Sequence, residues 1–167
     1  MRELLIRDAV PEDAERLVAI LNPIIETGTS TALDTPYTVE EERDYIAAFP
    51  ERGVFHVAVR LVDGRVVGLQ SVEPFTTGTH AFDHVGVMGT YVDLACHRQG
   101  IARRLFAATF EAARRKGYEK IFTYVRADND AGLATYLGQG FEVVGTARRH
   151  AKIRGRYVDE IMIERFL

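Results

Sequence analysis

A predicted strand–helix–strand unit in the second half of the chain constrains the fold more than any other sequence feature. Its helix covers residues 100–116, because apolar residues recur at helical spacing from Ile101 and Gly117 is a typical stop after the last turn. The flanking segments 84–94 and 120–126 have the residue types of strands. Strands joined by a helix are connected by a crossover rather than by a hairpin. The sheet therefore contains at least one crossover connection.

The remaining segments predict further strands and helices of one mixed α/β domain spanning residues 1–167. Asp63-Gly64 is typical of a hairpin turn, and Thr38 with Glu41 forms a capping-box pattern that opens a helix. The order β-α-α-β-β-β-α-β-α-β-β favours a largely antiparallel, twisted sheet of about seven strands flanked by about four helices. The other predicted strands cover residues 2–7, 54–62, 66–75, 141–146 and 157–165, and the other predicted helices cover residues 11–26, 38–49 and about 130–137.

The composition excludes several classes of protein. The 167 residues are 47% hydrophobic and carry a net charge of −3, which fits one globular domain and gives no overall basic footprint for nucleic acid. No apolar run approaches the roughly 20 residues of a membrane helix, and the N-terminus resembles a strand rather than a signal peptide. Cys96 is the only cysteine and the five histidines lack ligand spacing, which excludes an intrachain disulfide and argues against a metal site. We expect a cytoplasmic protein.

The turn that precedes the central helix is suited to bind an anion. Free backbone N–H groups and the positive end of the helix dipole meet there. Gly100 and Ala102 are small enough for a ligand to approach the backbone closely, and Arg98 with Arg103 could add charge-assisted contacts to phosphate. The alternative is an ordinary turn with solvated arginines. Neither a Walker A sequence nor a Gly-x-Gly-x-x-Gly pattern is present, so no motif supports a nucleotide-hydrolysing or a Rossmann fold.

Two sequence blocks resemble those of the GNAT superfamily of acyl-CoA-dependent N-acetyltransferases. The first is the family signature Gln/Arg-x-x-Gly-x-Gly/Ala, which residues 97–102 match as HRQGIA except at His97. The second is Asn-x-x-Ala-x-x-x-Tyr-x-x-x-Gly-Phe, which residues 129–141 match as NDAGLATYLGQGF except at Gly132. The blocks occur in the family's element order, and the resemblance covers essentially the whole chain. It implies the GNAT fold, with acetyl-CoA as the co-substrate.

The same resemblance implies which residues contact the cofactor. In the family, the backbone of the turn before the central helix contacts the pyrophosphate. An asparagine like Asn129, which can also cap the following helix, contacts the pantetheine or phosphate region. The implied cofactor-binding residues are Tyr91, Val92, His97, Arg98, Gln99, Gly100, Ile101, Ala102, Arg103, Asn129, Gly132 and Tyr136.

Shorter segments resemble one branch of the family. Residues 24–29 are similar to a segment of phosphinothricin acetyltransferases, and residues 84–93 and 155–159 are similar to bacterial L-amino acid N-acyltransferases. This branch implies that the acceptor is the α-amine of a small amino acid or an analogue. Phosphinothricin acetyltransferases carry a glutamate on the fourth strand that is thought to assist deprotonation of the amine, whereas the aligned residue here is Val87.

The implied reaction is direct attack of an amine on the acetyl-CoA thioester. The oxyanion that forms needs a hydrogen-bond donor, and the resemblance assigns this role to the backbone N–H of Val92 on the fourth strand. Gly86 and Gly89 within this strand fit a bulge or a close backbone approach. A thiol, with a pKa of about 8.5, leaves without a strong acid, and the resemblance makes Tyr136 its proton donor. From the residues alone, a buried aromatic on an amphipathic helix is the better interpretation of Tyr136.

No residue stands out as the base that removes the proton of the amine. Glu26 ranks first because its neighbours match the phosphinothricin branch, and Glu73, His84 or a water are the alternatives. Each of these side chains could instead be structural or solvated. Asp93 is expected to order the loop after the fourth strand. Cys96 has no paired base in the sequence, which argues against a covalent acyl-cysteine route.

A basic run near the C-terminus, Arg148 to Arg154 with Arg156, has two interpretations. It is either a solvated hairpin or rim that attracts an anionic ligand, or a surface for RNA. The first is favoured because no aromatic stacking pattern accompanies the arginines.

The sequence therefore predicts a single-domain, acetyl-CoA-dependent N-acetyltransferase. Acetylation of a protein N-terminus or of another amine is the alternative reaction. The alternative from another class is a CoA-binding module that has lost catalysis, which Val87 in place of a glutamate motivates. The family resemblance suggests a homodimer, with the C-terminal strands as its contact. Neither a nucleic acid nor a membrane is expected as a partner.

Overall fold

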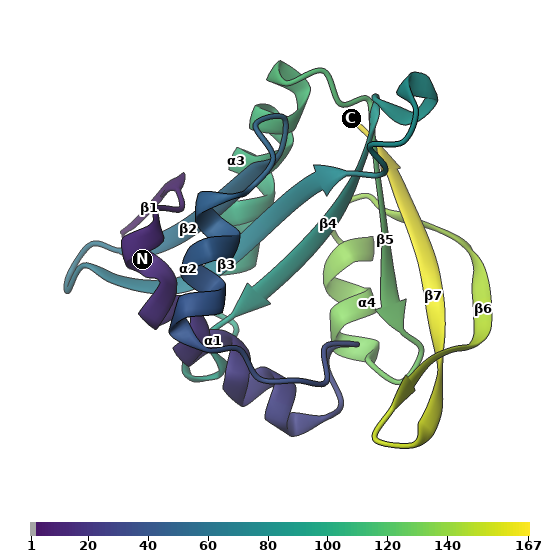
Figure 1. Cartoon of the computed structure of the whole chain (residues 1–167), viewed down its shortest axis with the longest axis horizontal. Helices are drawn as coiled ribbons and strands as arrows, with labels where there is room; N and C mark the ends of the chain where they lie inside the picture. Colours follow the sequence, from purple (N-terminus) through teal and green to yellow (C-terminus); the bar gives the residue numbers. More distant parts are fainter. Residues whose placement is uncertain (1–2) are drawn as a thin grey trace.

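The computed structural model describes residues 3–167, which form one seven-stranded sheet with helices on both faces (Figure 1). The element order and the mixed α/β class are as predicted. The strands are β1 (Leu4–Asp8), β2 (Val54–Arg60), β3 (Arg65–Pro74), β4 (Val85–Val92), β5 (Lys120–Arg126), β6 (Glu142–Ile153) and β7 (Arg156–Phe166). The helices are α1 (Ala14–Thr27), α2 (Val39–Ala47), α3 (Ile101–Arg115) and α4 (Asp130–Leu137), with short 3-10 turns at Pro11–Asp13, His80–Phe82 and Leu94–Cys96.

The strands lie in the order β1-β2-β3-β4-β5-β7-β6, and every pair is antiparallel except β4 with β5. Helix α3 supplies the predicted crossover between these two strands. Their parallel pairing covers three positions and ends at Val87 and Phe122. Beyond this point β4 and β5 separate and leave a wedge that is open at their C-terminal ends (Figure 1). The wedge positions the site described below.

Two layers of apolar side chains hold the helices against the sheet. Side chains alternate between the faces along β2, so Val57 packs in the cluster with α1 and α2 while Ala58 packs with α3. On the second face, Phe106 and Phe110 of α3 form an aromatic core that includes Tyr136 of α4. The two faces therefore bring different side chains to the wedge.

Local capping signals mark the start of two helices. The N–H of Glu41 donates to Thr38 Oγ1 at 3.2 Å and the N–H of Thr38 donates to Glu41 Oε2 at 2.8 Å, which confirms the predicted capping box. The Asn129 side chain accepts from the N–H of Gly132 at 2.9 Å and caps α4, also as predicted. A further prediction is wrong: Pro11 opens a separate 3-10 turn, and α1 begins only at Ala14.

The start of that 3-10 turn has a clear physical cause. The Asp13 carboxylate accepts from the N–H of Val10 at 2.9 Å and from the Arg7 guanidinium at 2.7 and 2.8 Å. Burial alone would raise the pKa of Asp13, but these hydrogen bonds and the Arg7 charge outweigh it and hold the pKa below its ordinary value.

The first strand was predicted from Arg2, which lies outside the described residues.

Gly86 allows close packing in the middle of the sheet, and no bulge forms between β3 and β4. Their register runs without a shift from the pair Gly68–Val92 to the pair Pro74–Gly86. A Cβ atom at Gly86 would lie 2.5 Å from Val72 Cγ1. Of the two alternatives that the strand glycines suggested, close approach therefore applies at Gly86.

The largest correction concerns the C-terminal hairpin. The strand predicted over residues 141–146 continues to Ile153, so most of the basic run lies on a strand. The predicted turn at Arg154 and Gly155 is present, and both residues have positive φ (50° and 77°), as a two-residue type I′ turn requires. The strand pairs up to this turn, with Ile153 opposite Arg156. Its sequence pattern is weak because most of β6 is exposed and its register with β7 shifts twice.

Strand β6 forms one edge of the sheet and leaves apolar side chains exposed. Val143 and Val144 on β6, with Tyr157 and Phe166 on β7, are more than half exposed. A homodimer through these strands stays a prediction.

Within residues 3–167, no helix is long and apolar enough to cross a membrane. In the same range, no group of three or more His, Cys, Asp or Glu side chains is placed to hold a metal ion.

Candidate active site

The wedge between β4 and β5 presents backbone donors that neither strand uses. Asp93 donates its N–H to the carbonyl of Val67 at 3.0 Å, so the odd-numbered residues of this segment bond to β3. In an antiparallel pair, such residues alternate with residues whose N–H and C=O groups point the other way. The N–H groups of Thr90 and Val92 therefore point into the wedge, where β5 no longer pairs. Val92 is the predicted oxyanion donor, and Thr90 adds a second donor that the sequence did not suggest.

The Tyr136 side chain reaches the same wedge from α4. Its hydroxyl donates to Thr90 Oγ1 at 3.0 Å, and the side-chain amide of Gln70 donates to the same oxygen at 2.9 Å. Tyr136 is 9% exposed and Gln70 is fully buried, so these bonds hold the hydroxyl in one place. Burial raises the pKa of Tyr136 well above its ordinary value, although the hydrogen bond to Thr90 acts in the opposite direction. The hydroxyl therefore stays protonated at neutral pH and can donate a hydrogen bond.

The turn before α3 groups the residues that were predicted to contact phosphate. Gly100 forms the N-cap with φ 77°, and Arg98 also has positive φ (60°). The Ile101 side chain is 3% exposed and packs in the core, so only its backbone is available to a ligand. Arg98 and Arg103 are exposed at the surface of the turn. The residues from His97 to Arg103 thus lie together at one helix N-terminus, with backbone donors and two guanidinium groups.

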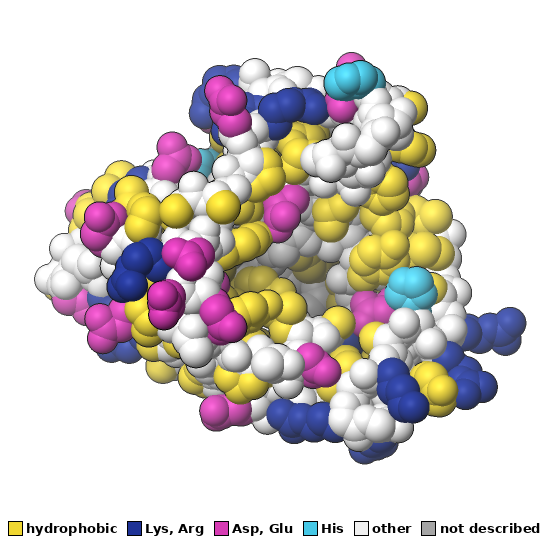
Figure 2. Space-filling view, viewed as in Figure 1, with side chains coloured by type: hydrophobic (Ala, Val, Ile, Leu, Met, Phe, Trp, Pro, Cys, Tyr) yellow, Lys and Arg dark blue, Asp and Glu magenta, His cyan; other side chains and the backbone are white. Residues whose placement is uncertain are grey.

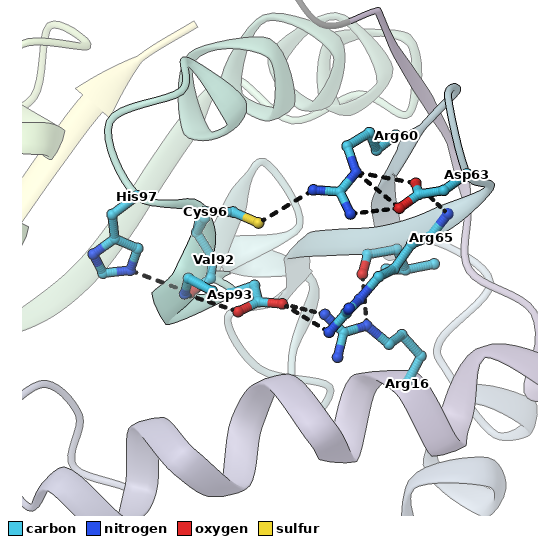
Figure 3. A network of polar contacts seen from close by, with 10 residues as sticks. Arg16, Arg60, Asp63, Arg65, Val92, Asp93, Cys96 and His97 are labelled. Carbon is cyan, nitrogen blue, oxygen red and sulfur yellow. Dashed lines mark hydrogen bonds and ion pairs between the residues drawn. The ribbon is translucent and has the colours of Figure 1, made fainter.

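A network of arginines and carboxylates fixes the turn that follows β4 (Figure 3). Asp93 accepts from the N–H of Ala95 at 2.9 Å, forms an ion pair with Arg16 of α1 and lies 3.6 Å from Arg65. Arg16 also donates to the carbonyl of Val66 at 2.8 Å, which ties α1, β3 and the end of β4 together. Burial alone would raise the pKa of Asp93, but the Ala95 N–H and Arg16 outweigh it and keep the pKa low. Asp93 therefore orders this turn, as the sequence suggested.

Two other residues singled out in the sequence lie beside this network. His97 Nε2 is 3.3 Å from the carbonyl oxygen of Val92 (Figure 3). Cys96 is buried, and its Sγ accepts from the Arg60 guanidinium at 3.8 Å. Because Cys96 contacts an arginine and lines neither of the two cavities at the wedge, the geometry gives no support to an acyl-cysteine route.

Two adjoining cavities open at the wedge. The larger, which we call the acidic cavity, has a volume of about 690 Å³ and is lined by α2, β3, β4 and the loop after α1. The smaller, the wedge cavity, has a volume of about 240 Å³ and is lined by β4, β5, α4 and residues 30–33 of that loop. The two cavities share Leu33, Met88, Gly89 and Tyr91, so ligands in the two cavities can meet at β4. Figure 2 shows the hollow at the centre of the molecule.

The loop after α1 is held across the wedge by side chains from its far side. Arg126, at the end of β5, donates to the carbonyls of Gly28 and Thr31 at 2.9 and 3.1 Å. Asn129 donates from its side-chain amide to the carbonyl of Ser30 at 3.1 Å. Arg126 had no signal in the sequence, because its partners lie about a hundred residues away along the chain.

Gly132 stands where the family usually has alanine, and it lies against the side chain that caps α4. A Cβ atom at this position would lie 2.5 Å from the side-chain nitrogen of Asn129. Glycine therefore leaves room for Asn129 to cap α4 and to reach the loop after α1 at the same time. Both residues line the wedge cavity.

Of the three side chains predicted as candidate bases, only Glu73 lines a cavity. Glu26, which ranked first, and His84 are exposed and line neither cavity. Glu73 lies on β3 directly opposite Val87 of β4, lines the acidic cavity and accepts a hydrogen bond from the Tyr45 hydroxyl. The carboxylate that the resemblance led us to expect on β4 thus has a counterpart one strand away.

Glu160 of β7 is a further buried carboxylate at the wedge cavity, and sequence reasoning missed it. It is 4% exposed, and its Oε1 has no hydrogen-bond partner among residues 3–167. Burial raises the pKa of Glu160, while the positive charges of Arg126 and His150 lower it. Glu160 lies opposite Arg126 in the pairing of β5 with β7, a neighbour that only the strand register reveals.

Comparisons with known proteins agree with this geometry. The chain matches the acetyltransferase (GNAT) domain family over residues 6–162. It is 26% identical over 165 residues to a phosphinothricin N-acetyltransferase of Streptomyces coelicolor, covering 98% of this chain and 96% of that protein. It is also 26% identical over 167 residues to the L-amino acid N-acetyltransferase AaaT of Escherichia coli, covering 99% of both.

A solved structure shares the fold. It is that of yncA from Salmonella typhimurium with its cofactor acetyl-CoA, which matches with a TM-score of 0.88 over 98% of this chain and 94% of that one, at 20% identity. The two sequence blocks that carry the family resemblance meet at the wedge, one in the turn before α3 and one in α4. With the family match extending over nearly all of the described residues, the chain belongs to the GNAT family of acetyltransferases and is an N-acetyltransferase.

Proposed function

We propose that this enzyme transfers the acetyl group of acetyl-CoA to the primary amine of a small molecule that enters through the acidic cavity. One observation carries the proposal: the two cavities meet at β4, where the Tyr136 hydroxyl bonds to Thr90 and the Thr90 N–H points into the wedge. The residues present fit the cofactor, because the turn before α3 offers donors and arginines to its phosphates. Acetyl-CoA, when bound, supplies the thioester.

Groups of this chain are placed for the transfer. As the amine nitrogen bonds to the thioester carbon and the carbon–sulfur bond breaks, the products are an amide and the thiol of CoA. One backbone N–H of this segment donates to the oxyanion that develops, either that of Val92, as predicted, or that of Thr90, because the two lie roughly 7 Å apart along the strand. The Tyr136 hydroxyl gives its proton to the departing thiolate and is reprotonated from water.

The proton that the amine loses goes to water in this proposal. An alkyl amine with a pKa of about 10.4 arrives protonated at neutral pH. Glu73 is opposite Val87, three residues before Thr90 on β4, which is roughly 10 Å along a strand. At that separation, Glu73 can accept the proton only through a water relay. Glu26 and His84 stay outside both cavities.

The acceptor predicted from the sequence is the α-amine of a small amino acid or an analogue. The names of the relatives from Streptomyces coelicolor and Escherichia coli support this prediction. The side chains of the acidic cavity favour another kind of amine, because they offer no cation to an α-carboxylate. Within the described part of the chain, none of its lining residues is a lysine, arginine or histidine.

Thiol release from acetyl-CoA tests the proposed function directly. We expect release that depends on a small primary amine, in a panel of L-amino acids, phosphinothricin, polyamines, simple alkyl amines and short peptides. Release with peptides alone would favour acetylation of a protein N-terminus. Tight acetyl-CoA binding without release for any amine would favour the non-catalytic CoA-binding module.

Replacing Asp93 with alanine should weaken acetyl-CoA binding by about tenfold, equivalent to about 1.4 kcal/mol. The substitution removes the acceptor for the Ala95 N–H and the partner of the half-buried Arg16, so the turn after β4 loses its anchor. Calorimetric titration with acetyl-CoA measures the effect. Asp63→Ala is the matched control, since Asp63 also pairs with an arginine but lies on the exposed β2–β3 hairpin. Equal affinity of Asp93→Ala and the parent protein would contradict the prediction.

A further inference from the structure

The acidic cavity is negatively charged on several sides. Four carboxylate side chains line it: Asp34, Glu41, Glu42 and Glu73. Because its lining within residues 3–167 includes no basic side chain, the carboxylates have no cation beside them in the cavity. Figure 2 shows acidic side chains around and inside the hollow. A cavity of this charge attracts cations and repels anions.

Glu42 is the most unusual of these carboxylates. It is 3% exposed, and its Oε1 has no hydrogen-bond partner among the described residues. Burial raises the pKa of Glu42 above its ordinary value. A buried, unpartnered carboxylate costs stability unless a counter-charge compensates it. Glu42 therefore has no compensating charge within the described part of the chain, and a cation bound in the cavity would favour its ionised form.

Glu73 is a second carboxylate of the acidic cavity, and several aromatic rings line the same cavity. The Tyr45 hydroxyl donates to Glu73, and the pKa of Tyr45 is raised by burial, by this hydrogen bond, and then by the charges of Glu73 and Glu42. Tyr45 therefore lies within the field of both carboxylates. Tyr37, Tyr45 and Tyr91 also line the cavity, and aromatic faces favour ammonium groups. Carboxylates and tyrosines together form a site suited to an alkylammonium ion.

The distance along β4 between Glu73 and the wedge sets the shape of the acceptor. Glu73 is opposite Val87, roughly 10 Å along β4 from Thr90 and the backbone donors of the wedge. The acidic cavity therefore extends along β4 beyond the wedge, and its volume of about 690 Å³ leaves room for a part of the acceptor other than the reacting amine. An extended molecule with two amino groups places one at each end of this path.

We propose that the acceptor is a diamine or polyamine without a carboxylate. One amino group is acetylated at the wedge, while Glu73 and Glu42 hold a second, distal ammonium group. This inference rests on the proposed function and narrows its substrate class. An α-amino acid fits less well, because its carboxylate would enter a cavity that already carries four.

Turnover of matched acceptors tests the proposal. We expect kcat/KM for putrescine to exceed that for butylamine, which lacks the second ammonium group, by at least tenfold. L-methionine and phosphinothricin should be weaker than butylamine, and L-methionine amide should be better than L-methionine. Higher kcat/KM for the free amino acids than for putrescine would overturn the proposal and leave the proposed function intact.

Two variants separate recognition of the distal ammonium from a role in proton removal. Glu73→Gln and Glu42→Gln should each raise KM for putrescine by at least tenfold, with kcat within threefold, and should raise KM for butylamine by much less. Glu40→Gln removes the same charge from an exposed position of α2 outside the cavity and should change neither acceptor's kinetics. An equal loss of kcat with putrescine and butylamine, with an altered pH profile, would make Glu73 part of the proton path and overturn its recognition role.

Two readouts do not depend on turnover. Calorimetry should detect putrescine binding to the parent protein and at least tenfold weaker binding to Glu42→Gln. The melting temperature of Glu42→Gln should not fall, because the substitution removes a buried charge. If no amine releases CoA yet putrescine binds in this way, the proposed function fails while the cation site stands. Putrescine binding unchanged in Glu42→Gln and Glu73→Gln would overturn the site.

Discussion

Tyr136→Phe should slow acetyl transfer by about 100-fold and leave the Kd for acetyl-CoA within about threefold. The substitution removes only the hydroxyl that donates to Thr90 Oγ1 and that stays protonated in its buried position. The ring keeps its place in the aromatic core with Phe106 and Phe141, so the fold should hold. The expected loss lies at the lower end of the range for general acids, since a thiolate is already a good leaving group.

Single-turnover rates and calorimetry measure the two halves of this prediction separately. Tyr118→Phe is the matched control, because Tyr118 is buried in the same apolar cluster, its hydroxyl has no partner within residues 3–167, and it lines neither cavity. It should turn over like the parent protein. If Tyr136→Phe also turned over like the parent protein, Tyr136 would have no part in proton transfer. Tyr136 would then be a core aromatic, as its residue type and helical position alone suggest.

Local signals in the sequence were sufficient for much of the fold. The helix from Ile101 to Arg115 follows from its apolar spacing, and the starts of α2 and α4 follow from Thr38 and Asn129, whose side chains bond to backbone a few residues away. Such contacts are visible in sequence because both partners lie within one turn. Strand β6 lacked a comparable signal, since its side chains are mostly exposed and two register shifts break the alternation.

The candidate site was less accessible to sequence reasoning because it depends on pairing between strands. Glu73 is a neighbour of Val87 only through the register of β3 with β4, and the direction of the Thr90 N–H follows from the same register. The family resemblance located the turn before α3 and Tyr136, which belong to contiguous blocks. It could not show that Glu42 of α2 lines the same cavity as Glu73.

Arg126→Met should be the most destabilising single substitution of a polar residue at the site, with a cost of about 3 kcal/mol and a melting temperature lower by roughly 6–12 °C. Arg126 is 5% exposed and donates to two loop carbonyls, those of Gly28 and Thr31, and to Asp128. Methionine keeps most of the apolar volume but leaves the loop without its anchor. It also removes the positive charge opposite the buried Glu160. Thermal and denaturant unfolding measure the loss.

The pH dependence of this loss separates the two effects of Arg126. Because burial raises the pKa of Glu160 in the fold above its value in the unfolded chain, the contribution of Glu160 to folding stability is greatest at acidic pH and is lost as pH rises through the folded pKa. Without the Arg126 charge, the folded pKa rises further, so the deficit of Arg126→Met should grow between pH 5 and pH 8. The hydrogen bond from Arg126 lowers the pKa of Asp128. The contribution of Asp128 to stability therefore changes with pH only below pH 5.

The double variant Arg126→Met with Glu160→Gln provides the decisive comparison. With the carboxylate removed, the loss caused by Arg126→Met should become independent of pH from 5 to 8 and should be smaller at pH 8 than in the parent background. The part that remains measures the bonds from Arg126 to the loop carbonyls and to Asp128. A deficit of Arg126→Met that is already independent of pH in the parent background would show that Glu160 does not depend on Arg126. The bonds to the loop after α1 and to Asp128 would then account for a buried arginine at the wedge.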